Sequence, residues 1–327
     1  MTIPLLPLKQ DVETKAILKK VAKAHQALAE LKGVAKSIPN EAILVNTLSL
    51  QEAKESSAIE NIITTHDELY QSNALTQQFV SIAAKEVFNY SKALQYGFQI
   101  VKETGILTNS YILRIQSEIE GNNAGFRKLP GTALKNQQTG EVVYMPPQDP
   151  DEIVKLMDNL EQFINDNELS DLDPLVKMAV IHHQFESIHP FYDGNGRTGR
   201  IINILYLVKQ DLLNLPILYL SRYINLNKKS YYELLQEVRD SGNWENWILF
   251  ILEGIESISR QTIVLLEGIK AEMQSYKNRI RLSLPKTASK YLNELEKIGL
   301  ISKVKLGKEN YYVNSALFQL LSNVNSR

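Results

Sequence analysis

The sequence predicts a mainly α-helical protein, and two observations support this prediction. Long stretches repeat the apolar spacing of amphipathic helices, at 10–31, 44–58, 74–98, 108–120, 150–166 and 173–187. Strand-like runs are short and come in two pairs, each around a polar turn, within 125–147 and 301–313. We therefore expect helices packed on helices, with one β-hairpin in the middle of the chain and a second near its C-terminus.

Several elements carry their own boundary signals. Asp173 stands just before Pro174, which is the usual entry to a helix, so this helix should lead directly into His189. A further helix is expected to open at 230–235, and a long apolar one from Trp244 onward. Gly299 predicts the end of an amphipathic helix that starts at 287.

Composition narrows the class of protein. The chain has 327 residues, enough for two or three domains, and its 44% hydrophobic and 22% charged residues are ordinary for a folded globular protein. It contains no cysteine, which excludes disulfides and cysteine-ligated zinc. The N-terminus lacks a basic region and is broken by prolines, and no apolar run approaches the ~18 residues of a membrane span. We expect a cytoplasmic protein with no membrane segment.

The segment 189–200, His-Pro-Phe-Tyr-Asp-Gly-Asn-Gly-Arg-Thr-Gly-Arg, is the most informative part of the chain. Residues 193–196 predict a tight turn, because Gly and Asn tolerate the backbone angles that turns need. An apolar helical pattern follows from Ile201 to Val208. The turn therefore opens onto a helix N-terminus, where free backbone N–H groups and the helix dipole favour an anion.

Charged side chains surround this turn. Arg197 and Arg200 are three residues apart and share one helix face, and guanidinium groups match phosphate oxygens. Asp193 offers the hard oxygen ligand that suits Mg²⁺, and His189 can act as a base near neutral pH. A glycine-rich turn or a single histidine would by itself indicate only packing. Their combination with Asp and two Arg predicts chemistry on a nucleotide phosphate. His182 and His183 lie among apolar residues of the preceding helix, so we expect them to pack rather than to bind a metal.

The segment matches the signature of the Fic family, His-Pro-Phe-x-Asp/Glu-Gly-Asn-Gly-Arg-x-x-Arg, at every fixed position. The resemblance implies a helical Fic fold and transfer of AMP from ATP to a hydroxyl of a target protein. His189 would deprotonate the target Ser, Thr or Tyr, and Asp193 would hold Mg²⁺. The resemblance assigns nucleotide binding to the rest of the turn and the helix start, and places a tyrosine pair beside the adenine: Gly194, Asn195, Gly196, Arg197, Thr198, Gly199, Arg200, Tyr231 and Tyr232.

A second motif lies upstream. Ser56, Glu60 and Asn61 resemble the inhibitory helix of the family, Ser/Thr-x-x-x-Glu-Gly/Asn, in the class that carries it N-terminal to the catalytic motif. The resemblance implies that Glu60 pairs with Arg200. This pairing would remove the partner of the γ-phosphate and put a negative charge in its place. On the residues alone, the same segment would indicate only a helix terminus.

The predicted hairpin within 125–147 resembles the family's flap, which covers the active site. The resemblance assigns Gly131, Thr132, Ala133 and Leu134 to clamping the target segment as an added strand. Main-chain pairing of that kind holds a peptide without reading its sequence. An ordinary surface hairpin is the alternative.

The C-terminal region differs in charge from the rest. Residues 271–327 hold ten Lys/Arg against four Glu, a balance of +6, which leaves −7 for the remainder of a chain whose net charge is −1. Helix, hairpin and basic bias together resemble a winged helix. DNA binding by this region and its use in building a homodimer both remain open, as does a surface with no partner.

We therefore expect an N-terminal helical region with the inhibitory motif at 1–100, a Fic catalytic core at 101–270 and a winged-helix-like domain at 271–327. The leading hypothesis is an autoinhibited protein adenylyltransferase that uses ATP and Mg²⁺. The alternatives are removal of AMP at the same site, transfer of another group such as phosphate or phosphocholine, and a DNA-binding regulator that uses nucleotide binding as a signal.

Overall fold

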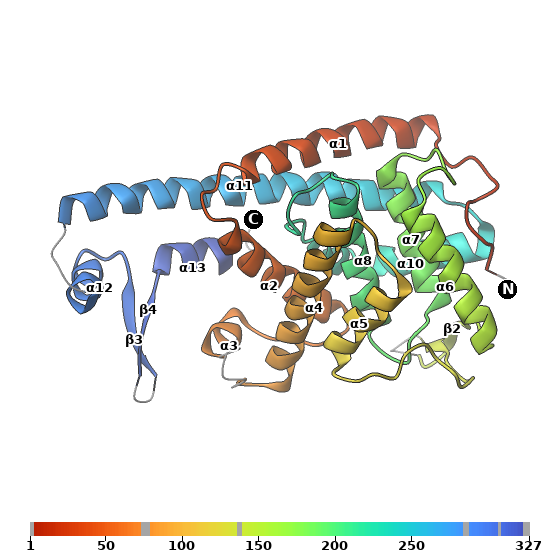
Figure 1. Ribbon diagram of the computed structural model, residues 1–327, viewed down its shortest axis with the longest axis horizontal. Helices are drawn as coiled ribbons and strands as arrows, with labels where there is room; N and C mark the ends of the chain where they lie inside the picture. Colours follow the sequence, from red (N-terminus) through yellow and green to blue (C-terminus); the bar gives the residue numbers. More distant parts are fainter. Residues whose placement is uncertain (1–2, 73–78, 136–138, 284–287, 307–308, 323–327) are drawn as a thin grey trace. The chain divides into compact units, whose positions relative to one another are not determined.

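The computed structural model describes residues 3–72, 79–135, 139–283, 288–306 and 309–322 (Figure 1). The chain forms two compact units, one from Met1–Lys32 with Asn40–Ser259 and one from Gly33–Pro39 with Arg260–Arg327. In chain order, the helices as far as residue 283 are α1 (Lys15–Ala35), α2 (Glu41–Ile59), α3 (His66–Gln71), α4 (Ile82–Thr104), α5 (Asn109–Glu120), α6 (Pro150–Asn165), α7 (Pro174–Ile188), α8 (Asn195–Lys209), α9 (Ser221–Leu226), α10 (Lys228–Ser241) and α11 (Glu245–Ser283). The prediction of a mainly helical protein is confirmed.

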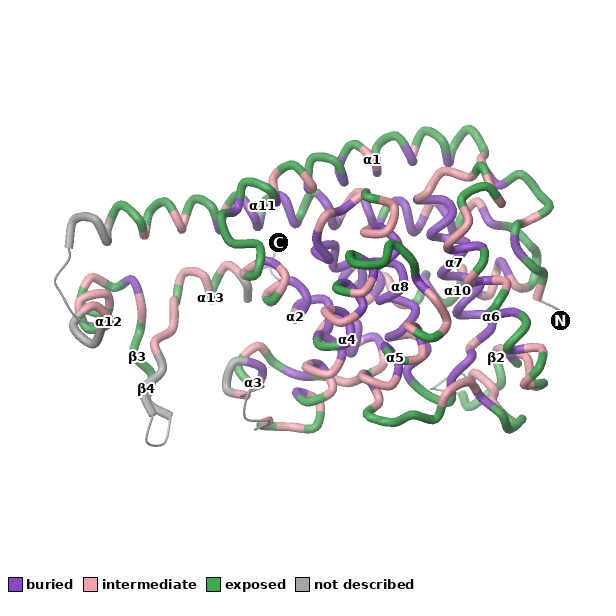
Figure 2. The backbone as a smooth tube through the Cα atoms, in the orientation of Figure 1, coloured by how far each residue is buried: buried purple, intermediate pink, exposed green. Residues whose placement is uncertain are grey.

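Two buried helices form the centre of the first unit. All but the first residue of α7 are buried, and α8 is buried over most of its length (Figure 2). Neither sequence has a separate polar face, which is typical of helices that have neighbours all round. α8 packs against α7, α4, α5 and α2, and α6 covers the other side of α7. The loop between α7 and α8, which carries the predicted site, is thus fixed at both ends by the core.

The ends of α7 and α8 explain how the loop is set. Asp173 caps α7, since its Oδ1 accepts a hydrogen bond from Leu175 N at 2.9 Å, and Pro174 follows at the first helical position. α7 ends at His189, which has a left-handed backbone with φ of 49°. α8 starts after Gly194, whose φ of 78° favours glycine and which has no side chain to cap the first amides of the helix.

The predicted flap hairpin is present and small. β1 (Leu134–Lys135) pairs antiparallel with β2 (Val142–Tyr144), with a register shift between the two residues of β1. Of the four predicted docking residues, only Leu134 belongs to a strand. The part of the expected turn at 136–138 lies outside the described residues. Gln148 ties down the entry to the flap, because its side chain accepts from Gly131 N at 2.7 Å and donates to Thr132 O at 2.9 Å.

Some predicted boundaries were wrong. The third N-terminal helix was expected at 74–98, whereas α4 runs from Ile82 to Thr104, and 74–78 lie outside the described residues. Ser81 caps α4 through Ala84 N, and Gly105 ends it with a φ of 72°. The short helices α3 and α9 were not predicted. They are too short for a periodic pattern, although Thr65 and Glu68 form a capping box at the start of α3.

The second unit contains the end of α11, α12 (Ala288–Lys297), β3 (Ser302–Leu306), β4 (Glu309–Val313) and α13 (Ser315–Ser322). The predicted helix and hairpin are present here, although residue 287 and the turn at 307–308 lie outside the described residues. β3 and β4 pair antiparallel in continuous register, and the Tyr276 hydroxyl donates to Leu300 O at 2.8 Å. Within the described residues, no helix has the length and apolar character needed to cross a membrane.

Candidate active site

The loop between α7 and α8 is closed by its own side chains. Asn195 Oδ1 accepts from Phe191 N and its Nδ2 donates to Phe191 O, both at 2.8 Å. Phe191 is fully buried and packs its ring against Phe126 and Phe185 at centroid distances of 5.4 and 6.3 Å. The two polar atoms of the Asn195 side chain are thus used to close the loop. Its predicted contact with phosphates stays a prediction, and the backbone N–H groups at the start of α8 are the predicted anion cradle.

His189 lies at the end of α7 with a neutral imidazole. Burial and, to a smaller extent, the positive charges of Arg127 and Arg239 lower the pKa of His189 to about 4, against the opposing effect of Glu60. Its Nδ1 has no hydrogen-bond partner among the described residues. A neutral imidazole has one unprotonated ring nitrogen that can accept a proton, which is what a general base must do.

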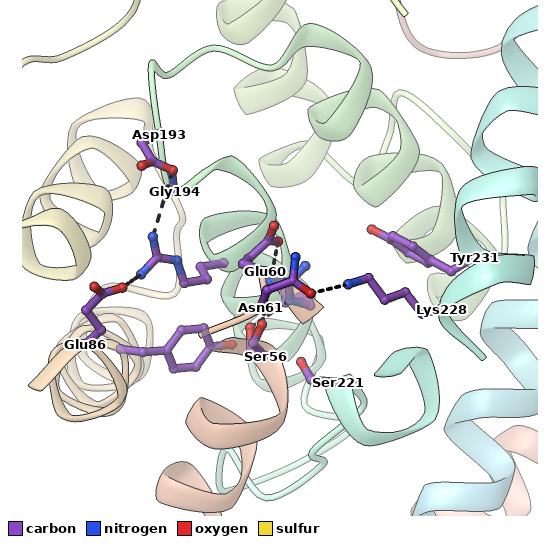
Figure 3. A network of polar contacts seen from close by, with 12 residues as sticks. Ser56, Glu60, Asn61, Glu86, Asp193, Gly194, Ser221, Lys228 and Tyr231 are labelled. Atoms are coloured by element: carbon purple, nitrogen blue, oxygen red, sulfur yellow. Dashed lines mark hydrogen bonds and ion pairs between the residues drawn. The ribbon is translucent and has the colours of Figure 1, made fainter. Parts of the chain in front are cut away.

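Arg200 is buried and held by the helix that carries the inhibitory motif (Figure 3). Its Nε donates to Ser56 Oγ at 2.7 Å, and its Nη2 donates to Ser56 O at 3.0 Å and to Glu60 Oε1 at 2.9 Å. Burial disfavours the guanidinium charge, yet Glu60 keeps the pKa of Arg200 above its usual range. The structure thus brings together the three residues Ser56, Glu60 and Arg200.

The Glu60 carboxylate also reaches the start of α8. A Cβ added at Gly196 would collide with Glu60 Oε1 and would come within 2.8 Å of Arg200 Nη1. The carboxylate therefore lies against the predicted anion cradle. Asn61 follows in a left-handed conformation with φ of 62°, and its Oδ1 accepts from Lys228 Nζ at 3.1 Å. This contact fixes the chain just after the carboxylate (Figure 3).

Arg197 has its own acidic partners, which the sequence did not indicate. Its Nη2 donates to Glu120 Oε1 at 2.7 Å and its Nη1 to Glu86 Oε2 at 3.1 Å, while Asp193 Oδ1 lies 3.9 Å away. The Arg197 side chain is only 5% exposed, so these contacts hold it in one place. Glu86 comes from α4 and Glu120 from the end of α5, and no local motif marks either residue.

Asp193 is the exposed carboxylate of the loop. Its side chain is 80% exposed, and its Oδ1 accepts from Gly194 N at 2.7 Å. The described residues contain no group of three His, Asp or Glu side chains that could hold a metal ion. A single exposed carboxylate nevertheless fits Mg²⁺ that arrives with nucleotide phosphates, because this ion keeps several waters and takes one or two carboxylates from the protein.

The remaining predicted nucleotide contacts have different surroundings. Thr198 is fully buried, and Gly199 faces Phe185 and Glu186 so closely that a Cβ would lie 2.6 Å from Glu186 Oε1. Gly199 therefore lies where α8 packs against α7. The predicted contacts of both residues with the nucleotide stay predictions. Tyr231 is also internal, and its hydroxyl lies 2.9 Å from His182 Nε2. Its neighbour Tyr232 is 44% exposed, and the predicted adenine contact of the tyrosine pair stays a prediction.

His182 and His183 pack in the core, as the sequence predicted. Both are buried, His182 against Tyr231 and His183 with its Nε2 at 3.2 Å from Leu235 O. Sequence analysis missed Arg127, Tyr144 and Arg239, which contact the backbone around His189. Only Arg127 had a local signal, its place directly after Gly-Phe at the start of the predicted flap.

Three family models match this chain. "Fic/DOC family N-terminal" matches residues 18–99, "Fic/DOC family" matches residues 106–207, and "Protein adenylyltransferase SoFic-like, C-terminal domain" matches residues 279–317. The second match contains all of the 189–200 segment. The first contains Ser56 and Glu60.

Curated relatives are similar over part of their length. The chain is 25% identical over 172 residues to Protein adenylyltransferase Fic of Aedes aegypti and 27% identical over 117 residues to the protein of the same name of Drosophila erecta. These matches cover 52% and 36% of this chain and 32% and 23% of the two relatives. The chain thus spans about a third or less of their length.

Among solved structures, a Fic family protein from Desulfovibrio desulfuricans G20 has a similar fold, with a TM-score of 0.65 at 19% sequence identity. The likeness covers 95% of this chain and 98% of that one. At such low identity it shows the fold alone. The three family models, the fold and the complete signature agree, and the chain belongs to the Fic/DOC family.

Proposed function

We propose that this chain is an autoinhibited protein adenylyltransferase, which transfers AMP from ATP to a Ser, Thr or Tyr hydroxyl of a target protein and releases pyrophosphate. One observation carries the proposal. The Glu60 carboxylate is bound to Arg200 at 2.9 Å and lies against Gly196, at the helix N-terminus that favours an anion. A carboxylate in this position mimics a phosphate, and a neutral imidazole stands at the other end of the same loop.

The chemistry follows from the residues around the loop. The target oxygen forms a bond to the α-phosphorus as the bond from that phosphorus to the pyrophosphate oxygen breaks, and His189 takes the hydroxyl proton. Arg197 and Arg200 neutralise the charge of the leaving pyrophosphate, together with the first amides of α8. Asp193 would hold Mg²⁺, which supplies further charge neutralisation when it is bound with ATP. Tyr232 borders the adenosine.

Target recognition is proposed for the flap. Gly131 N and Thr132 O are already bound by Gln148, so Ala133 and Leu134 supply the backbone groups for an added strand. Such an interaction fixes the hydroxyl in line with the phosphorus and leaves target choice to other contacts. The basic C-terminal region is proposed to serve either DNA binding or dimerisation. Its excess charge supports the first of these and its size is compatible with both.

Inhibition is proposed to be competitive at Arg200. While Glu60 holds this arginine, the γ-phosphate lacks its partner and meets a negative charge. Glu60→Gly removes that charge, and we expect AMP transfer to rise by about tenfold or more, since a gain of ~1.4 kcal/mol in favour of the phosphate already gives a factor of ten. Glu41→Gly, at the other end of α2, is the matched control and should leave transfer at the parent rate.

The test is incubation of each variant with ATP labelled at the α- or the γ-phosphate, Mg²⁺ and a cell lysate. Protein labelled from the α-position only, more strongly in Glu60→Gly and not at all in Glu60→Gly with His189→Ala, is the expected result. Label from the γ-position would show phosphate transfer instead. Equal labelling by wild type and Glu60→Gly would rule out the inhibitory role of Glu60.

A further inference from the structure

The backbone on both sides of His189 is bound by side chains from elsewhere in the fold. Five consecutive carbonyls, those of residues 186–190, each accept a hydrogen bond. Arg239 Nη2 donates to Glu186 O at 3.2 Å, and the Tyr144 hydroxyl donates to Ser187 O at 2.9 Å. Arg127 binds the other three: its Nη2 donates to Ile188 O at 3.5 Å, its Nε to His189 O at 2.8 Å and its backbone N to Pro190 O at 2.8 Å.

These contacts fall where the backbone needs support. The last carbonyls of a helix have no partner within the helix, and here they are the carbonyls that end α7. His189 adopts a φ of 49°, a left-handed conformation that is unfavourable for a residue with a Cβ. Such a conformation persists only when its surroundings over-determine it. The five hydrogen bonds do this for the residue that carries the proposed base.

Arg127 also joins the two ends of the flap. It stands at the N-terminal base, and its Nη2 donates to Pro147 O at the C-terminal base at 2.8 Å. Its side chain is 1% exposed, so the guanidinium is fixed in the core. Arg239, from α10, adds a second link, because its guanidinium lies 3.9 Å from the ring centroid of Tyr144 in β2. The flap and the His189 backbone are therefore one hydrogen-bonded assembly.

We propose that Arg127, with Tyr144 and Arg239, is a positioning residue that holds the flap in register with His189, so that a target hydroxyl docked on the flap meets the imidazole in line with the α-phosphorus. This inference rests on the proposed function. It assigns a task to three residues outside both motifs. Arg127 touches neither substrate in this scheme and acts through the backbone of His189 and through the flap.

The charges around His189 give the proposal a second readout. Arg127 from the flap base and Arg239 from α10 face the imidazole with positive charge, and Glu60 from α2 faces it with negative charge. Removal of the Arg127 charge should therefore raise the pKa of His189 from its present value of about 4 toward the ordinary 6.5. Lysine at the same position keeps the positive charge but lacks the planar guanidinium that donates to both His189 O and Pro147 O.

The experiment compares Arg127→Met, Arg127→Lys and Tyr144→Phe in the Glu60→Gly background. Arg114→Met, an exposed arginine on α5, is the matched control. The rate and the KM for ATP are measured on automodification with α-labelled ATP. The His189 imidazole is titrated by NMR, with the signal assigned by its loss in His189→Ala.

For Arg127→Met we expect a rate about 100-fold lower with the KM for ATP unchanged, since a misplacement of ~1 Å has a cost of that order. Arg127→Lys should lose rate while His189 keeps its low pKa, and Tyr144→Phe should lose about fivefold, the worth of one hydrogen bond. If Arg127→Met does not fold, the rate of Tyr144→Phe still tests whether these hydrogen bonds position His189. Full rate in Arg127→Lys and in Tyr144→Phe would overturn the proposal.

The two proposals can fail separately. If the Glu60→Gly parent shows no transfer at all, the proposed function fails. The titration still decides the role of Arg127: an unchanged His189 signal in Arg127→Met rejects it, and a raised pKa with a shifted signal supports it.

Discussion

At the residue scale, the site is organised around the partners of two arginines. Arg197 and Arg200 lie on the first two turns of α8, and each already donates hydrogen bonds to oxygen atoms. Ser56 accepts two hydrogen bonds from Arg200, at its Oγ and at its carbonyl oxygen, in addition to the ion pair of Arg200 with Glu60. Glu60 can therefore leave without releasing Arg200. In this scheme α2 both inhibits the enzyme through Glu60 and orients Arg200 through Ser56.

This dual role predicts that Ser56→Ala lowers transfer when it is combined with Glu60→Gly. The Arg200 Nε would lose its partner at 2.7 Å, and a hydrogen bond to a charged group is worth ~1.5–3 kcal/mol, so the rate should fall by about 10- to 100-fold. Ser57→Ala is the matched control, because Ser57 is equally buried and its Oγ has no hydrogen-bond partner among the described residues. Equal rates for the two double variants would contradict the role of Ser56.

The sequence allowed only part of this site to be predicted. The residue types and spacing within 189–200 indicated an anion site, but only the family resemblance led to the pairing of Glu60 with Arg200. The partners of Arg197 are different, because Glu86 and Glu120 are 111 and 77 positions away and belong to ordinary amphipathic helices. The neighbouring residues in the sequence do not show whether such a carboxylate binds an arginine or is exposed to solvent. The motif also did not show that Asn195 closes the loop and that Gly199 faces α7, because a motif does not distinguish such structural contacts from contacts with a ligand.

At the element scale, long helices were predictable and short segments were not. α7 was placed within a residue at each end, because Asp173 and Pro174 mark its start and its apolar pattern is strong. α13 and the two short helices of the first unit were missed, since six to eight residues hold too few turns for a period to show. The flap was found from its turn residues. Its actual pairing is shorter than predicted because Gln148, rather than a strand, holds residues 131 and 132.

The flap should depend on Gly131, whose φ of 109° is open to glycine and strained for any residue with a Cβ. We expect Gly131→Val to reduce labelling of target proteins by about tenfold through a higher KM for the target, with ATP binding unchanged. Gly105→Val is the matched control, since Gly105 has a φ of 72° and open space around it at the end of α4. An equal loss of labelling in both variants would mean that backbone strain alone, and not the flap, is responsible.

At the scale of the whole molecule, the first unit buries an unusual set of titratable groups. Burial lowers the pKa of His66 and His189 to about 4 and of His182 and His183 to about 3. Burial also raises the pKa of Glu52 and Glu186 to about 7, with Glu52 accepting hydrogen bonds from Ser221 and Tyr90. These four histidines and the two carboxyls are thus all neutral in the folded protein near pH 6. The histidines and the carboxyls change the free energy of unfolding in opposite directions as the pH is varied.

The sign of the pH dependence follows from proton counts. Between about pH 4.5 and 6.5 the four histidines are protonated in the unfolded chain and neutral in the folded chain. Glu52 and Glu186 behave in the opposite way, because they are protonated in the folded chain and ionised in the unfolded chain. Unfolding therefore takes up a net of about two protons. The free energy of unfolding should therefore fall as the pH is lowered from about 6.5. It should change little between about pH 6.5 and 7, because there the protons on the unfolded histidines and those on the two folded carboxyls nearly balance. Urea unfolding followed by circular dichroism across this range measures the slope. His66→Gln, at a partly exposed position, should lower the number of protons taken up on unfolding by about one, and so reduce the slope of the free energy of unfolding against pH below about 6.5. A free energy of unfolding that rises on acidification would show that the two buried carboxyls outweigh the histidines.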